Sequence, residues 1–176
     1  MNGFAFQSKK YVNSGIKVIR ITNVQKGRIV DNDPQYYPEE TYETIKDYML
    51  EEDDLLMSLT GNCGRVGLLP IEMCPAALNQ RVACLRINES IVNKMFVFAT
   101  LNMDGFENDV ISAASGSAQK NMSTEWLKKY NILVPPMEVQ EQFAEFVKQS
   151  DKSKYISMKV RQSCITIMNG FIATFA

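Results

Sequence analysis

The sequence predicts an α+β fold: a globular domain of mixed sheet and helix over residues 1–136, followed by one long helix over residues 137–176. Up to Val134, short segments with the periodicity of strands alternate with segments of helical periodicity. The pair Pro135-Pro136 then interrupts regular structure, because proline fixes φ and pushes the preceding residue towards an extended conformation. From Met137 to Asn169 the chain contains no further glycine or proline, which favours a continuous helix.

Composition limits the class of protein. A chain of 176 residues, 45% of them hydrophobic, is long enough for one domain with a core plus an appendage. It has no apolar run of about 18 residues and no signal-like N-terminus, so we expect a cytoplasmic protein without membrane contact. The four cysteines are scattered and histidine is absent, which predicts buried thiols, no metal site and no cofactor. The lack of histidine also argues against a Ser-His or Cys-His nucleophile and so against hydrolytic catalysis.

Charge is distributed unevenly along the chain although the formal net charge is only −1. Residues 1–30 contain six cations and no acid, whereas residues 31–54 contain ten acids and a single cation, Lys46. A basic segment of this kind can bind a polyanion even when the total charge is near zero. The alternative is an uneven but ordinary solvated surface.

The first half of the chain predicts strands separated by turns. Residues 16–24 alternate apolar and polar side chains, as a half-buried strand does, and residues 38–49 have helical spacing behind an acidic first turn. Residues 55–70 read as strand, glycine turn and strand, with Gly61 and Gly64 in the turn. A strand after the glycines argues against a dinucleotide-binding motif, which needs a helix there.

The second half predicts another strand and then helices. Residues 77–87 form the strand, and residues 92–104 form an apolar helix that Gly105 should end. A polar loop follows at 115–123, then a short helix with Ser123 as its N-cap, and a strand leading to the prolines.

The long helix shows a weak heptad pattern with apolar residues at both ends and small or polar ones in the middle. A helix of about 33 residues is some 50 Å long, more than one small domain can cover, so its apolar stripe should pair with another helix. We expect an antiparallel coiled coil that forms a homodimer, with a seam of Phe143, Phe146, Val160, Cys164, Ile167 and Phe171.

Four stretches in this order resemble the target-recognition domain of a type I restriction-modification specificity (S) subunit. They are NSGIKVIRITNVQKGRI, EEDDLLMSLTGNCGRVGLL, ALNQRVACLRI and SGSAQKNMSTEWLKKYNILVPPMEVQEQF. The resemblance implies a non-catalytic subunit that reads one half of a bipartite DNA target. It also implies adenine methyltransferase (M) subunits and a restriction or motor (R) subunit as partners. Such subunits have two recognition domains and two long helices, whereas this sequence has one of each; it resembles a half-size subunit or an excised half.

A DNA reader needs cations for phosphates and amide or guanidinium groups for base edges. The candidate DNA-binding residues on this basis are Lys9, Lys10, Lys17, Arg20, Lys26, Arg28, Asn62, Arg65, Asn79, Gln80, Arg81, Gln119, Lys120 and Asn121.

Three other functions stay open. In an adenine methyltransferase motif an Asn or Asp directly precedes Pro-Pro, but here Asn131 lies four residues before Pro135, so a catalytic amide would be misplaced. The chain is alternatively the detached recognition domain of a fused restriction-methyltransferase enzyme, or a non-catalytic assembly module that does not read DNA.

Overall fold

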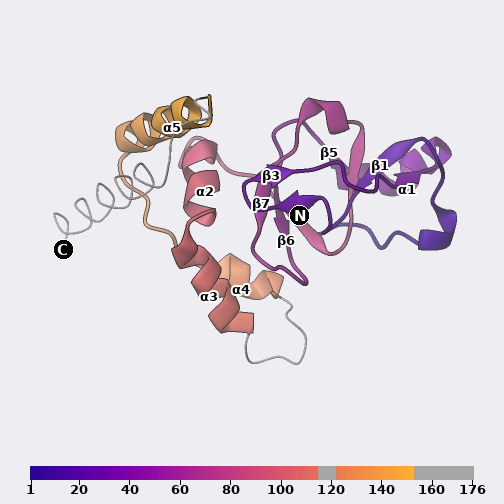
Figure 1. Cartoon of the computed structure of the whole chain (residues 1–176), viewed down its shortest axis with the longest axis horizontal. Helices are drawn as coiled ribbons and strands as arrows, with labels where there is room; N and C mark the ends of the chain where they lie inside the picture. The colour runs from indigo at the N-terminus through magenta and orange to yellow at the C-terminus, as the bar shows by residue number, and fades with distance from the viewer. Residues whose placement is uncertain (115–121, 153–176) are drawn as a thin grey trace.

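The computed structural model describes residues 1–114 and 122–152, and it shows a mixed α+β fold (Figure 1). The strands lie in the first half of the chain and the longer helices α2, α3 and α5 in the second. The α+β class predicted from the sequence is confirmed. The part of the long helix beyond Lys152 lies outside the described residues.

The central layer is a three-stranded antiparallel sheet of order β7-β6-β9. Strand β6 (Leu55–Ser58) pairs with β7 (Val66–Leu68) on one side and with β9 (Val82–Leu85) on the other. The predicted strand, glycine turn and strand are therefore confirmed. Every residue of β6 is buried, because one face of this sheet packs on a second sheet and the other on helices.

The second sheet has the order β4-β1-β8-β5, with β4 at Tyr36–Tyr37, β1 at Ile16–Ile19, β8 at Ala76–Leu78 and β5 at Met49–Leu50. Strands β1 and β8 run parallel and the other pairs antiparallel. Its side chains share one core with the central sheet, including Ile19, Leu56 and Leu78. A small hairpin of β2 (Val24–Gln25) and β3 (Arg28–Ile29) packs beside β7.

Two predicted strands are each divided by a turn. The strand expected at 16–24 ends at Ile19 because the Asn23 side chain closes a turn, accepting a hydrogen bond from Arg20 N at 2.9 Å and donating to Val30 O at 2.9 Å. The strand expected at 77–87 is split into β8 and β9 by a turn in which Asn79 Oδ1 accepts from Arg81 N at 3.1 Å. Both expectations of one continuous strand were wrong, since local asparagine side chains compete with the ladder for backbone groups.

The helix expected at 38–49 is replaced by three short pieces: η2 (Glu39–Thr41), α1 (Tyr42–Ile45) and η3 (Lys46–Tyr48). Met49, expected on that helix, instead begins β5 and pairs with Ala77. Two further short 3-10 turns, η1 (Ser8–Lys10) and η4 (Ile71–Met73), complete this half of the chain.

The helices α2 (Lys94–Leu101) and α3 (Asp104–Ala114) cover the free face of the central sheet. Gly105 was expected to end the first of them, but it lies in the first turn of α3 instead. Helix α2 ends at Leu101, where Asn102 Nδ2 donates back to Phe98 O at 2.9 Å.

Helix α4 (Thr124–Lys129) begins as predicted, with Ser123 Oγ accepting from Trp126 N at 3.0 Å. The strand expected at 131–136 is absent: this segment is extended and pairs with no strand among the described residues. Leu133 and Val134 in it are 68% and 47% exposed.

Helix α5 (Met137–Lys152) packs across α2 (Figure 1). The Phe143 ring meets Phe96 of α2 edge-on with centroids 5.7 Å apart, and Ala144 is buried. The expectation that this stripe finds no cover in its own domain is therefore wrong for the first turns of the helix. Phe143, expected at a dimer seam, packs within the chain, whereas Phe146 is 39% exposed. The seam positions Val160, Cys164, Ile167 and Phe171 lie outside the described residues.

Among the described residues, no helix has the length and apolar character needed to cross a membrane. Within the same residues, no cluster of histidine, cysteine or carboxylate side chains is arranged to hold a metal ion. Of the thiols described, Cys84 is buried as expected, and burial raises its pKa to about 12, while Cys63 and Cys74 are only half-buried.

Candidate nucleic-acid interface

The glycine turn that joins β6 to β7 is closed by one buried serine. Ser58 Oγ donates to Asn62 O at 2.5 Å and accepts from Arg65 N at 3.1 Å, while Ser58 O accepts from Gly64 N at 2.9 Å. Ser58 is 1% exposed, so these bonds are made in an environment that water does not reach. The turn is thus held as a defined loop that sets where Asn62 and Arg65 lie.

Gly64 is required by both conformation and space. Its φ of +80° lies in the left-handed region, and a Cβ there would come within 2.9 Å of Val110 on α3. Gly61 also has a positive φ, +70°, but no atom lies within 4 Å of the place its Cβ would take. The turn therefore packs against α3 at Gly64 and has free space beside Gly61.

The β2–β3 hairpin brings a second set of polar groups to the glycine turn. Arg65 Nη1 donates to Gln25 Oε1 at 2.7 Å, and Gly27 N donates to Val66 O at 2.9 Å. In the amide orientation that satisfies its neighbours, the Asn62 oxygen lies 3.3 Å from both Nη1 and Nη2 of Arg65. Arg28 is the register partner of Gln25, so both side chains leave the same face of the hairpin.

The β8–β9 turn, Asn79 to Arg81, lies at the same end of the central sheet. Leu59, which begins the glycine turn, donates from its N to Arg81 O at 2.9 Å, and its own O accepts from Met122 N at 2.9 Å. Gln80 and Arg81 are exposed. Three segments distant in sequence therefore meet here: the glycine turn, the β8–β9 turn and the chain that resumes at Met122. We call this region, with the β2–β3 hairpin, the glycine-turn end.

Two hollows flank the glycine turn, and Gly61, Asn62 and Arg65 line both of them. The hollow towards α3 has a volume of about 210 Å³ and is also lined by Lys26 and Glu107. The hollow on the other side, of about 410 Å³, is lined by Gln25, Asp33 and Thr60, among others. Arg65 thus lies between two depressions, each of which is lined by polar and apolar groups.

Three of the predicted DNA-binding cations form ion pairs within the chain. Lys17 Nζ lies 2.6 Å from Asp31, Arg20 Nη2 lies 2.9 Å from Asp33, and Lys26 Nζ lies 2.5 Å from Glu107 and 3.1 Å from Asp104. The bond to Glu107 raises the pKa of Lys26, and the bond from Arg20 lowers the pKa of Asp33. The basic N-terminal segment is therefore partly neutralised by the acids that follow it.

Lys17 differs from the other two because it is buried. It is only 8% exposed on the central part of β1, so its charge belongs to the fold and does not project as a phosphate contact. Lys26 is 39% exposed in its side chain and lies beside α3.

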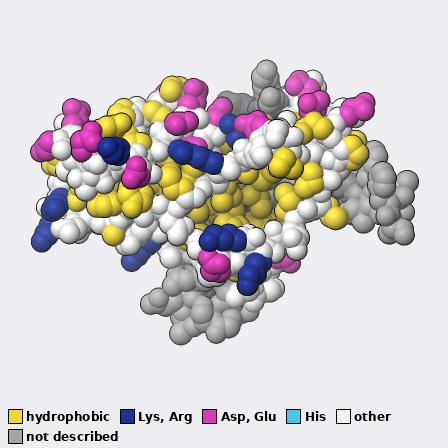
Figure 2. Space-filling model, turned by 180° about the vertical axis from the view of Figure 1, so that it is seen from behind, with side chains coloured by type: hydrophobic (Ala, Val, Ile, Leu, Met, Phe, Trp, Pro, Cys, Tyr) yellow, Lys and Arg dark blue, Asp and Glu magenta, His cyan; other side chains and the backbone are white. Residues whose placement is uncertain are grey.

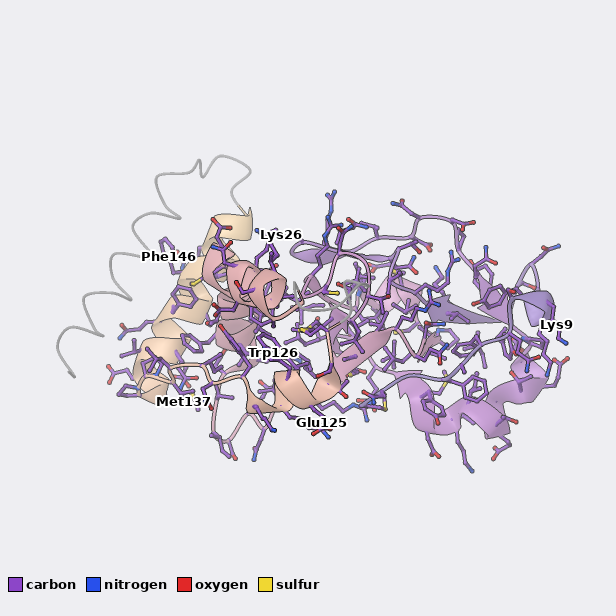
Figure 3. The ribbon with its side chains drawn as sticks, turned by 90° about the horizontal axis from the view of Figure 1, so that it is seen from below. Lys9, Lys26, Glu125, Trp126, Met137 and Phe146 are labelled. Carbon is purple, nitrogen blue, oxygen red and sulfur yellow. The ribbon has the colours of Figure 1, made fainter. Side chains whose placement is uncertain are left out.

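The remaining candidates do not form one basic face. Lys9 and Lys10 are exposed on η1, and Figure 3 shows Lys9 near one end of the molecule, well apart from Lys26. On the face shown in Figure 2, lysines and arginines are scattered among acids and apolar side chains. Gln119, Lys120 and Asn121 lie outside the described residues, next to Met122, which is anchored at the glycine-turn end.

Sequence reasoning missed Gln25 and Ser58, the side chains that fix Arg65 and its loop. Gln25 lies 40 residues before Arg65, and no local sequence pattern predicts the contact between them. The signal for Ser58 was its place at the end of a buried strand directly before a glycine turn, where a hydroxyl can satisfy turn N–H groups.

Comparison with known proteins identifies the family. The family model for the type I restriction modification DNA specificity domain matches residues 2–164. The chain is 26% identical over 165 residues to the type I restriction enzyme MjaVIII specificity subunit of Methanocaldococcus jannaschii, covering 92% of this chain and 39% of that protein. It is 30% identical over 148 residues to the EcoBI specificity subunit of Escherichia coli, covering 82% and 28%. The chain therefore spans well under half the length of these relatives.

Two solved structures share the fold. One, described as the structural basis of complex assembly and conformational transition of the type I R-M system, aligns with a TM-score of 0.63 at 13% identity, over 99% of this chain and 38% of that one. The HsdS subunit from Thermoanaerobacter tengcongensis aligns with a TM-score of 0.61 at 15% identity, over 86% and 34%. A match to the family model along nearly all of its length, together with this fold, shows that the chain belongs to the type I restriction modification DNA specificity domain family.

Proposed function

We propose that this chain is a DNA-recognition unit of a type I restriction-modification complex, and that it reads one half of a bipartite target. The observation that carries the proposal is the gathering of amide and guanidinium side chains at the glycine-turn end. Asn62 and Arg65 come from one turn, Gln80 and Arg81 from a second, and Arg28 from the hairpin. These are the groups that contact base edges and phosphates in DNA-binding proteins.

The free cations of this end supply the attraction to the DNA backbone. Among the described residues, neither Arg28 nor Arg81 takes part in an ion pair, and both are exposed. A cation that is not neutralised by a neighbouring carboxylate gains most from a phosphate, because no internal pair has to break first. Lys9 and Lys10 lie on η1, outside the glycine-turn end, and we assign them no part in this contact.

The proposed partners follow from the relatives, which are specificity subunits of type I restriction enzymes. We infer that methyltransferase subunits dock on this chain, that a restriction or motor subunit joins the complex, and that the complex works in the cytoplasm. The chain itself carries out no catalysis in this scheme and needs no cofactor.

We also propose that two such units pair through the helix over residues 137–176, either as a homodimer or with a second half of the subunit. Because α2 covers Phe143, the pairing falls on the later turns of the helix, starting near Phe146. Two identical readers related by a two-fold axis would read an interrupted palindrome.

Salt dependence tests the DNA-binding proposal. Affinity for a pool of random duplexes should fall linearly with the logarithm of salt concentration, with a slope of about −0.9 for each phosphate contacted. Fluorescence anisotropy between about 50 and about 200 mM salt measures that slope. An assembly module that does not read DNA, the competing function, would show no binding to the pool at the lower salt.

A further inference from the structure

We propose that Arg65 recognises a guanine in the major groove of the half-site, and that Gln25 is the positioning residue that aims its guanidinium group. The inference rests on the proposed function and deepens it, because it assigns one base and one side chain to the recognition step. Three features support it: the donors of Arg65 that remain open, the way in which the side chain is held, and its place in the fold.

The first feature is the set of Arg65 donors that the chain already uses. A guanidinium group has five N–H donors in a rigid plane. Nη1 donates to Gln25 Oε1 at 2.7 Å, and the Asn62 oxygen faces the edge formed by Nη1 and Nη2, 3.3 Å from each. Among the described residues, none accepts from Nε, and Asn62 alone faces Nη2. The edge formed by Nε–H and the outer N–H of Nη2 therefore remains open.

That open edge matches one base. Its two N–H groups are parallel, and guanine presents two adjacent acceptors, O6 and N7, in the major groove. Adenine offers an acceptor, N7, and a donor, the N6 amino group, in the same positions. One of the two arginine N–H groups would therefore face another donor and lose its hydrogen bond. Thymine and cytosine do not present a pair of adjacent acceptors either.

The second feature is that neutral amides hold the arginine. Gln25 is itself fixed, because its Nε2 donates to Thr22 O at 3.0 Å, which turns its Oε1 towards Arg65. Amides orient a guanidinium without neutralising it, and among the described residues no carboxylate forms an ion pair with Arg65. The group is therefore preorganised and still fully charged, so little side-chain entropy is lost when it binds a base.

The third feature is the place of Arg65 at the base of a loop fixed by Ser58, between two hollows. Arg65 is half-buried and held from two sides, which suits a base contact that demands fixed geometry.

The test begins with the unaltered chain. A half-site motif is selected from randomised duplexes, and 7-deazaguanine, which lacks the N7 acceptor, then replaces each guanine of the motif in turn. We expect one position at which this change weakens binding about tenfold, since a good bidentate pair discriminates by roughly 5- to 150-fold. The probe requires no mutant, so a folding defect cannot imitate the result.

Variants then assign that position to the side chains. Arg65→Gln should lose both the preference for guanine at that position and the sensitivity to 7-deazaguanine there, because an amide pairs with adenine and cannot donate to both O6 and N7 of guanine, while preferences at other positions stay. Gln25→Leu, which removes the acceptor that holds Nη1, should weaken the same preference several-fold and leave the preferences at other positions unchanged. Arg86→Gln is the matched control: Arg86 pairs with Asp54 at the other end of β9, and this variant should select the unaltered motif.

Each other outcome overturns part of the account. A motif without guanine, or a guanine preference that Arg65→Gln retains, contradicts the assignment while the proposed function stands. An Arg65→Gln variant that binds all sequences more weakly to the same extent, with a smaller salt slope, would identify a phosphate contact instead. If the unaltered chain shows no salt-dependent binding to any duplex, the proposed function itself fails.

Discussion

At the residue scale, burial gives the charge of Lys17 a structural role. In the sequence it is one of six cations ahead of any acid, and in the structure it is 8% exposed and 2.6 Å from Asp31. A buried charge is tolerated only with a partner, so the pair is part of the fold.

Lys17→Glu should therefore destabilise the protein. It would place a carboxylate beside Asp31 in a poorly hydrated position, at a cost of about 3 kcal/mol in the free energy of unfolding. Urea denaturation followed by circular dichroism measures the change. Lys9→Glu, on an exposed residue, is the control and should lie within about 0.5 kcal/mol of the unaltered chain. Equal stability of the two variants would contradict a structural role for Lys17.

The two glycines of the turn allow a second paired comparison. Gly61→Ala should cost about 1 kcal/mol, the penalty of an L-residue in the left-handed region. Gly64→Ala should cost about 1–3 kcal/mol more, because its methyl group would also press on Val110 at 2.9 Å. The same denaturation measurement compares them. A Gly61 variant that is as unstable as the Gly64 variant would show that backbone strain alone decides the cost.

At the scale of elements, one glutamine joins the long helix to the globular domain. Gln140 is 1% exposed; its Oε1 accepts from Asn93 N at 2.8 Å, and its Nε2 donates to Pro135 O at 2.7 Å. It therefore ties the first turn of α5 to the start of α2 and to the proline pair. This is the physical role of the sequence that follows Pro135-Pro136: the prolines stop one element, and Gln140 fixes the angle of the next.

Gln140→Leu should cost about 2 kcal/mol, because it leaves a backbone N–H and a backbone C=O without partners. Gln149→Leu is the matched control on the same helix, since within the described part of the chain Gln149 bonds only to the exposed Glu145. Thermal unfolding of both variants should show a lower midpoint for Gln140→Leu alone. Midpoints that fall equally would place the cost in helix propensity and not in the buried bonds.

The contact between α3 and the end of α4 should make stability depend on pH. Tyr130 Oη donates to Asp109 at 2.7 Å, and burial followed by this bond raises the pKa of Tyr130 from 10.0 to about 12. A raised pKa means that the contribution to stability is complete below pH 10 and is lost as pH rises towards 12. Unfolding free energies over that interval should fall more steeply for the unaltered chain than for Tyr130→Phe. Parallel curves would contradict the assigned pKa shift.

Elements that local chemistry decides could be predicted from the sequence. The strand, glycine turn and strand over residues 55–70 and the Ser123 cap depend on residues that are close neighbours, and both are confirmed. The turn at Asn79 also carried a local signal, an asparagine able to bond its own backbone, but the continuous apolar run concealed it.

Contacts across the fold could not be predicted. The Lys26 pairs with Asp104 and Glu107, and the Gln25 contact with Arg65, join segments 40 or more residues apart. No periodicity records them, because each depends on how the hairpin sits against α3 and β7. The packing of α5 against α2 could not be predicted for the same reason, since it depends on the contact between Phe96 and Phe143.

At the scale of the whole molecule, we propose that the glycine-turn end faces the DNA. The candidate cations divide between two parts of the molecule. Arg28 and Arg81 belong to the glycine-turn end, whereas Lys9 and Lys10 lie on η1. We expect the arginine pair, and not the lysine pair, to contact the duplex. Charge reversal in each part therefore separates the two locations while changing the net charge equally.

The most direct measurement is equilibrium binding to the selected duplex by two double variants, Arg28→Glu with Arg81→Glu and Lys9→Glu with Lys10→Glu. All four residues are exposed, so both proteins should keep their fold, which circular dichroism verifies. We predict that charge reversal at Arg28 and Arg81 weakens binding by at least about a hundredfold and lowers the salt slope by about 2. Charge reversal at Lys9 and Lys10 should change the affinity and the slope little. Loss of binding in the lysine variant, with the arginine variant unaffected, would contradict this prediction.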